Sequence, residues 1–260
     1  MTGQTPEITP EELEALRVAL TPLINTQFDV LKLPRLILPG FEPGQIGSLA
    51  GLLMDACIPQ LAEILPPDEA AKVRQVGLNR HAGDLGDREV YPDYIHQSGK
   101  RLELKALYVD PEDVEMKKPP TPREPSARLT QKVTLNNVNP TTDVLLVIAH
   151  QLRPDKHDPD LFSITIIDLG LFSMIECVRS RDQRLLNGGG MWFGNYLTPT
   201  VLSKTGKIKK KLGEALDTTT YGRKAEEGRD FNEDTNFGKL SRIPYPPLRA
   251  FLKLHGAKTQ

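Results

Sequence analysis

Two runs of almost unbroken apolar residues, at positions 143–150 and 161–168, constrain the fold of this 260-residue chain more than any other feature. Strands that are apolar on both faces are typical of the centre of a β-sheet covered on both sides. Hydrophobic residues make up 38% of the chain and charged residues 26%, which is ordinary for a globular protein large enough to build one core. The sequence therefore predicts an α/β fold with a mixed central β-sheet flanked by helices.

Helical patterns dominate the first part of the chain. Thr9 is a candidate N-cap, Pro10 suits the first turn and Glu12 completes a capping box, so a helix is predicted to about residue 25. Further helices are predicted at 45–65, 68–76 and 170–186. We expect residues 1–80 to form a helical region packed on a core of residues 81–260, within one continuous globular domain.

A hairpin is predicted between these helices, from strands at 88–97 and 100–109. Five prolines between positions 110 and 126 indicate that a long loop follows it. The second strand places Glu103 and Lys105 two residues apart, so both side chains project from one face. The alternate apolar side chains, which we expect to face a core, are Leu102, Leu104 and Ala106.

Burying charged side chains without partners is costly, so the Glu and Lys on this strand indicate a use for them. Asp93 lies on the first strand of the same hairpin. A divalent cation held by Asp93 and Glu103 would satisfy both carboxylates, with Lys105 beside the ion and a bound phosphate. The alternative is an amphipathic strand in which Glu103 and Lys105 form only a surface ion pair.

The pattern Tyr91-Pro92-Asp93, nine residues, and then Glu103-Leu104-Lys105 resembles that of the PD-(D/E)XK nuclease superfamily, whose fold many restriction endonucleases share. Other Pro-Asp and Glu-x-Lys sequences occur in the chain, but only this pair lies on an apolar alternating segment. The resemblance implies a restriction-endonuclease-like core and a Mg²⁺-dependent endonuclease, with Mn²⁺ as a substitute.

The same resemblance implies roles for individual residues. Asp93, Glu103 and Lys105 would be catalytic, and the metal would be held by Asp93, Glu103 and the carbonyl of Leu104. An additional acid would come from Glu63 or Glu89. The compact length favours a type II restriction enzyme that acts as a homodimer on a short palindromic site in double-stranded DNA.

Candidate DNA contacts are basic or amide side chains of the segments that follow the hairpin. They are Lys117, Lys118, Arg123, Arg128, Gln131, Lys204, Lys207, Lys209, Lys210 and Lys211. Five of them lie within residues 203–211, which contain no acid, and such a density of lysines suits backbone phosphates. A solvated loop and an ordinary polar surface are the alternative explanations.

Charge is distributed unevenly along the chain. Residues 1–70 carry 10 acidic and 3 basic residues, whereas the rest carry 24 acidic and 30 basic ones, so the excess positive charge accompanies the predicted site. No apolar run approaches the roughly 20 residues that span a membrane, and the acidic N-terminus is unlike a secretory signal. The two cysteines suggest no disulfide framework, and a cytoplasmic protein without membrane partners is predicted.

Two other functions are compatible with these residues. One is a repair, recombination or structure-specific nuclease of the same fold, and the other is a catalytically inactive, nuclease-like DNA-binding module. Nucleotide-binding loops and histidine-based metal spacings are not evident in the sequence.

Overall fold

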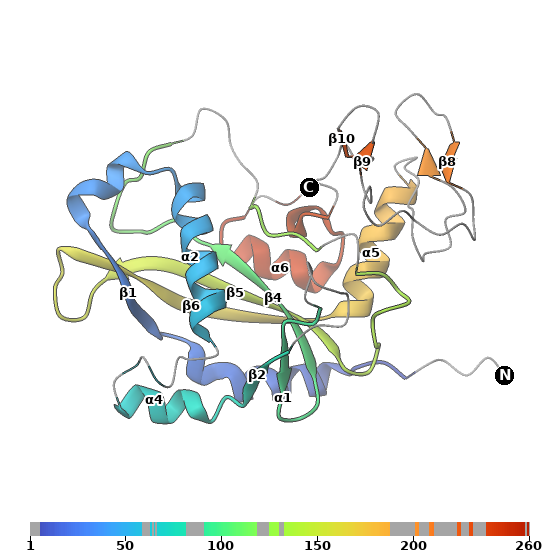
Figure 1. The fold of residues 1–260 in the computed structure, drawn as a ribbon, viewed down its shortest axis with the longest axis horizontal. Coiled ribbons are helices and arrows are strands. Elements are labelled where there is room, and N and C mark those ends of the chain that lie inside the picture. The colour runs from blue at the N-terminus through green and yellow to red at the C-terminus, as the bar shows by residue number, and fades with distance from the viewer. Residues whose placement is uncertain are drawn as a thin grey trace.

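The central element is a mixed β-sheet with strand order β1-β6-β5-β4-β3-β2 (Figure 1). The strands are β1 (Gln27–Pro34), β2 (Leu78–Arg80), β3 (Tyr94–His96), β4 (Arg101–Tyr108), β5 (Asp143–Pro154) and β6 (Leu161–Ser173). Neighbouring strands are antiparallel except β4 and β5, which are parallel. The predicted α/β class and mixed sheet are therefore confirmed.

The computed structural model describes residues 6–58, 63, 65, 67–81, 91–118, 125–129, 133–187, 201–202, 208–210, 223–224, 229–230, 238–257 and 259. Its helices are α1 (Pro10–Leu20), α2 (Pro43–Cys57), α4 (Pro67–Arg74), α5 (Met174–Asn187) and α6 (Pro246–Leu254). Short 3-10 turns span Thr21–Leu23, Arg35–Gly40 and Leu240–Arg242. Two small two-stranded ribbons pair β7 (Val201–Leu202) with β8 (Ile208–Lys210) and β9 (Arg223–Lys224) with β10 (Arg229–Asp230).

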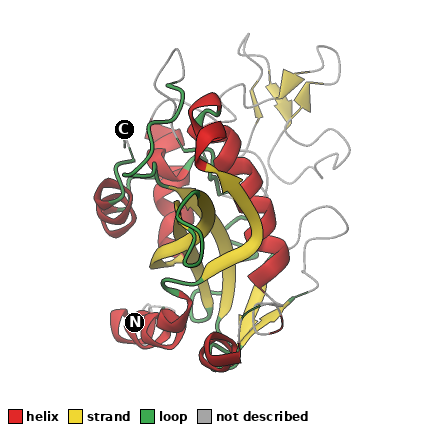
Figure 2. Ribbon diagram, turned by 90° about the vertical axis from the view of Figure 1, so that its left-hand side faces the viewer, coloured by secondary structure: helices red, strands yellow, loops and turns green. Residues whose placement is uncertain are grey.

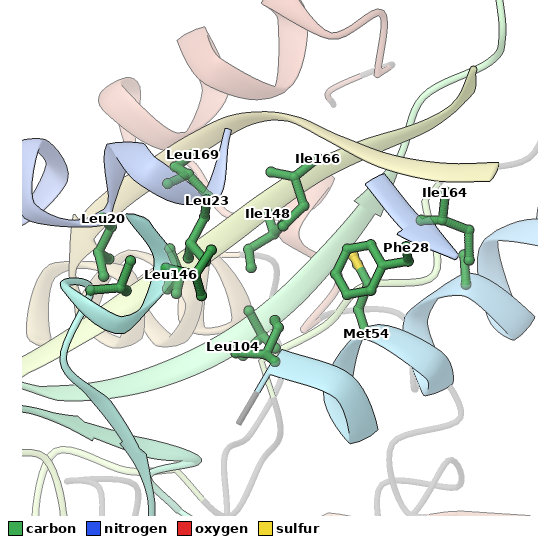
Figure 3. Close-up of a cluster of buried hydrophobic side chains, with 14 of the residues drawn as sticks. Leu20, Leu23, Phe28, Met54, Leu104, Leu146, Ile148, Ile164, Ile166 and Leu169 are labelled. Carbon is green, nitrogen blue, oxygen red and sulfur yellow. The ribbon is translucent and has the colours of Figure 1, made fainter. Parts of the chain in front are cut away.

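Helices cover both faces of the sheet, which curls between them (Figure 2). One face packs against α1, α2 and α4, and Figure 3 shows Leu104 of β4 turned into this cluster with Met54 of α2. The other face packs against α5 and α6, and Leu107 and Val147 belong to that second cluster. Each strand of the centre thus contributes to two cores, as the apolar runs predicted.

The predicted start of α1 is confirmed. The Glu12 N–H donates to the Thr9 hydroxyl at 3.2 Å, and the Thr9 N–H donates to the Glu12 carboxylate at 2.9 Å, which is a complete capping box. The helix ends at Leu20 instead of about residue 25, because a 3-10 turn and then Asn25, with a positive φ of 67°, redirect the chain into β1.

Several boundaries differ from the prediction for one reason, the length of antiparallel pairing. Strands β5 and β6 pair from Val144↔Ser173 to Pro154↔Phe162, well beyond the two predicted runs. This pairing holds residues 170–173 extended, so α5 begins at Met174.

Three elements differ from the prediction in kind. Strands β1 and β2 lie in the region predicted to be helical but join the same sheet, and α6 was not predicted. The domain division at residue 80 remains a prediction.

Within the described part of the chain, no helix combines the length and the apolar character that crossing a bilayer requires.

Candidate active site

The predicted alternation along β4 is confirmed. Leu104 faces the first core, while Glu103 and Lys105 project from the opposite face together with Arg101 and Leu107. Glu103 is buried, with 3% of its surface exposed, and Lys105 is half-buried. The two charged side chains therefore lie at the edge of the second core.

Asp93 is bound to the backbone of β4 on both sides of Glu103. Its N–H donates to the carbonyl of Leu102 at 3.0 Å, and its carboxylate accepts the N–H of Leu104 at 2.7 Å. The regular β3–β4 ladder begins one residue later, at Tyr94, so the Asp93 side chain takes the place of a backbone partner for Leu104. The predicted motif residues of the two strands are thus brought side by side.

Glu103 and Lys105 form a close ion pair. Lys105 Nζ lies 2.6 Å from Glu103 Oε1, and 21% of the Lys105 side chain is exposed against 4% for Glu103. A buried carboxylate requires a cation or several donors to remain charged. Lys105 supplies one such cation, and its partial exposure leaves its ammonium group within reach of a ligand in solvent.

A second charged cluster lies at the start of β4 and β5, and sequence reasoning missed it. Arg101 and Asp143 are in-register partners of the parallel pair, and Arg101 Nε lies 3.1 Å from Asp143 Oδ1. The Tyr91 hydroxyl donates to Asp143 Oδ2 at 2.6 Å, and the Arg101 guanidinium lies 5.7 Å from the centre of the Tyr91 ring. Asp143 has 1% of its surface exposed and Tyr91 also 1%.

The remaining donors to Asp143 come from its own turn, namely the Asn139 N–H at 2.9 Å and the Thr142 hydroxyl at 2.9 Å. Each oxygen of Asp143 thus has two partners. Burial raises the pKa of Tyr91 far above its ordinary value, and the nearby Asp143 and Glu103 carboxylates raise it further. The Tyr91 hydroxyl is therefore a permanent donor. The only sequence signal for this cluster was an aspartate opening an apolar strand.

The residues present fit a hard divalent cation. Asp93 and Glu103 supply carboxylate oxygens, the ligands that Mg²⁺ prefers. The N–H and C=O of one strand residue point toward the same neighbouring strand, so the Leu104 carbonyl is directed toward Asp93 together with its N–H. Among the described residues, no group of three His, Cys, Asp or Glu side chains is placed to hold a metal ion.

The other predicted residues lie partly outside the described part of the chain. Glu63 is described and exposed, whereas Glu89 lies outside the described residues. Lys117 and Lys118 are exposed, and the Lys117 N–H donates to the Phe41 carbonyl beside α2. Arg128 is exposed and forms an isolated bridge with Lys239.

The predicted lysine cluster is described only in part. Lys209 and Lys210 belong to β8. The DNA-contact candidates outside the described residues are Arg123, Gln131, Lys204, Lys207 and Lys211.

Comparison with models of known protein families finds no match. Curated proteins and solved structures likewise contain no match to this chain.

Proposed function

We propose that this chain is a Mg²⁺-dependent endonuclease that hydrolyses phosphodiester bonds of double-stranded DNA. One observation carries the proposal. Asp93 is bound to the backbone of β4 on either side of Glu103, and Lys105 contacts Glu103 from the next outward position of the same strand. Two carboxylates and one amine thus lie on adjacent segments at the end of the β3–β4 ladder, where a cation and a phosphate could be held together.

Each of these residues has a role in phosphodiester hydrolysis. Asp93, Glu103 and the Leu104 carbonyl would hold Mg²⁺, or Mn²⁺ in its place. The bound cation would lower the pKa of a coordinated water and neutralise charge on the phosphate. Without a metal, Lys105 Nζ donates to the Glu103 carboxylate. If Glu103 bound a cation instead, the Lys105 ammonium group would be available to donate to a phosphate oxygen or to hold the attacking water.

Within this class, the proposal extends to a type II restriction enzyme that acts as a homodimer on a palindromic site. The support is that the described residues carry one such group of side chains, on the six-stranded sheet, whereas cleavage of both DNA strands needs two. Repair, recombination and structure-specific nucleases would use the same centre on other substrates.

A catalytically inactive DNA-binding module is the second candidate. The observation in its favour is the 2.6 Å contact of Lys105 Nζ with Glu103 Oε1, which gives the buried carboxylate a cationic partner without a metal. In this case the two side chains only stabilise the sheet.

Incubation of the purified protein with plasmid DNA, with and without Mg²⁺, separates these functions. Discrete fragments support the restriction enzyme, while smearing or nicking at branched structures supports the other nucleases. An intact plasmid with Mg²⁺ and with Mn²⁺ rejects the nuclease proposal. Sedimentation of the protein with and without DNA tests the homodimer.

A further inference from the structure

We propose that Tyr91 is a positioning residue for the metal site, and that it holds Asp93 against β4 through its hydrogen bond to Asp143. The proposal rests on the function proposed above and deepens it. It assigns a purpose to a buried polar cluster that contains neither of the predicted metal-binding carboxylates.

The first step is the shortness of the connection. Only Pro92 separates Tyr91 from Asp93, and proline has one fixed backbone dihedral angle, so a displacement of Tyr91 is transmitted to Asp93 with little slack. Tyr91 is anchored on β5 by the 2.6 Å bond from its hydroxyl to Asp143. Asp93 is anchored on β4 by its bonds to Leu102 and Leu104. The segment 91–93 therefore bridges two strands of the sheet.

The second step is the rigidity of the anchor. Asp143 accepts hydrogen bonds from Tyr91, Thr142 and the Asn139 N–H, forms an ion pair with Arg101, and is almost completely buried. A buried carboxylate with two partners on each oxygen loses a great deal by moving, since any lost bond leaves a desolvated charge poorly satisfied. For the same reason Asp143 is ill suited to bind a metal itself.

The third step is the location of the Tyr91 ring. It belongs to the second core together with Leu107 and Leu145, and the Arg101 guanidinium lies 5.7 Å from its centre. Along the chain, Tyr91 is two residues from Asp93, a predicted metal ligand. Tyr91 thus connects Asp143, the Arg101 side chain and the carboxylate site. Partners that orient metal ligands in this way affect metal affinity strongly.

The test uses Tyr91→Phe, which removes only the hydroxyl, and Tyr108→Phe as the matched control. Tyr108 lies on the same strand as Glu103, and its hydroxyl donates to the Met116 sulfur at 3.3 Å on the other face of the sheet. Binding of Mn²⁺ alone to each full-length protein is measured by titration calorimetry or by electron paramagnetic resonance. Thermal unfolding without metal reports on the fold.

Tyr91→Phe should weaken Mn²⁺ binding about tenfold, whereas Tyr108→Phe should change it less than about twofold. In plasmid cleavage, the Mg²⁺ concentration for half-maximal rate should rise for Tyr91→Phe while the rate at saturating Mg²⁺ falls little, because the reacting groups are all present. A loss of rate at saturating Mg²⁺ with unchanged Mn²⁺ affinity would contradict a positioning role.

Asp93→Asn distinguishes this inference from the proposed function. If Asp93→Asn loses Mn²⁺ binding and Tyr91→Phe retains it, the inference is overturned and the function stands. If Asp93→Asn binds Mn²⁺ as the wild type does, both are overturned. Should Tyr91→Phe fail to fold, Thr142→Val replaces it, because this hydroxyl donates to the same carboxylate. Mn²⁺ affinity of Thr142→Val equal to that of the wild type would then reject the proposal.

Discussion

The Asp93 carboxylate accepts the backbone N–H of Leu104 at 2.7 Å, which ties the Asp-bearing segment to the strand that carries Glu103 and Lys105. This bond lies beyond the end of the β3–β4 ladder. Here the Asp93 side chain accepts the β4 backbone N–H, whereas along the ladder a backbone carbonyl of the neighbouring strand accepts it. It leaves the two motif carboxylates on adjacent segments of the sheet, as a shared cation requires.

Replacing Asp93 by Asn should abolish Mg²⁺-dependent cleavage, with a loss of at least about 100-fold in rate, since the metal loses a charged ligand. The fold should persist, because the amide oxygen of Asn can still accept the Leu104 N–H. Plasmid cleavage and circular dichroism measure the two effects. Asp113→Asn, at an exposed position in the loop after β4, is the control and should cut like the wild type.

Mg²⁺ should raise the unfolding temperature of the wild-type protein but not that of Glu103→Gln. A ligand that binds only the folded state stabilises it by about 3 kcal/mol at 100 times its dissociation constant. The neutral amide keeps the size of Glu103 but removes the charge that holds the cation. Thermal unfolding with and without Mg²⁺ is the measurement. Equal shifts in both proteins would favour the inactive module, in which Glu103 only pairs with Lys105.

His150 should make stability depend on pH. It is 1% exposed on β5, its ring packs edge-on against Tyr108 at 5.6 Å, and burial lowers its pKa from 6.5 to about 4. At pH values between these two pKa values, His150 is protonated in the unfolded chain but neutral in the folded protein. The free energy of unfolding should therefore fall by about 3 kcal/mol as the pH falls from 7 to 4.

Urea denaturation across this pH range checks the prediction. His150→Leu should lose this part of the pH dependence, whereas His157→Gln, at an exposed histidine in the β5–β6 turn, should keep it. Identical slopes in wild type and His150→Leu would mean that another group titrates in this window.

Two glycines on one face of α2 should respond in opposite ways to alanine. A Cβ at Gly47 would lie 2.9 Å from the Tyr108 Cβ, whereas a Cβ at Gly51 would lie 3.7 Å from the Ala106 Cβ, an ordinary contact. Gly47→Ala should destabilise the protein by about 1–3 kcal/mol, because α2 must move away from β4. Gly51→Ala should stabilise it by up to about 1 kcal/mol through helix propensity. Chemical denaturation of both variants decides whether this close approach exists.

Lysines of β8 should contribute to DNA affinity without selecting a sequence. Replacing Lys209 and Lys210 together by Gln should weaken binding to all duplexes and lower the slope of log affinity against log salt by about 2, one for each lost phosphate contact. Fluorescence anisotropy with a labelled duplex at several salt concentrations measures the slope. Lys253→Gln, an exposed lysine of α6, should leave it unchanged.

Features that depend on near neighbours in the chain were predictable. The capping box of Thr9 and Glu12 needs only residues three apart, and the two faces of β4 follow from the alternation of its side chains. The central apolar strands were recognisable because side chains buried on both faces leave an unbroken run. The pairing of Glu103 with Lys105 belongs to the same group, since side chains two apart on a strand share a face.

Features that depend on distant partners were decided only by the tertiary structure. Strand β1 exists because it pairs with β6, whose paired residues are 127 to 138 positions away in the sequence, and β5 and β6 extend as far as their mutual pairing does. The parallel register of β4 and β5 brings Arg101 beside Asp143, and the folded segment before β3 then brings Tyr91 to both. The sequence alone determines the local periodicity of side chains along each helix or strand. Which strands become neighbours depends instead on contacts between residues far apart in the chain, which form only when the long loops between them close.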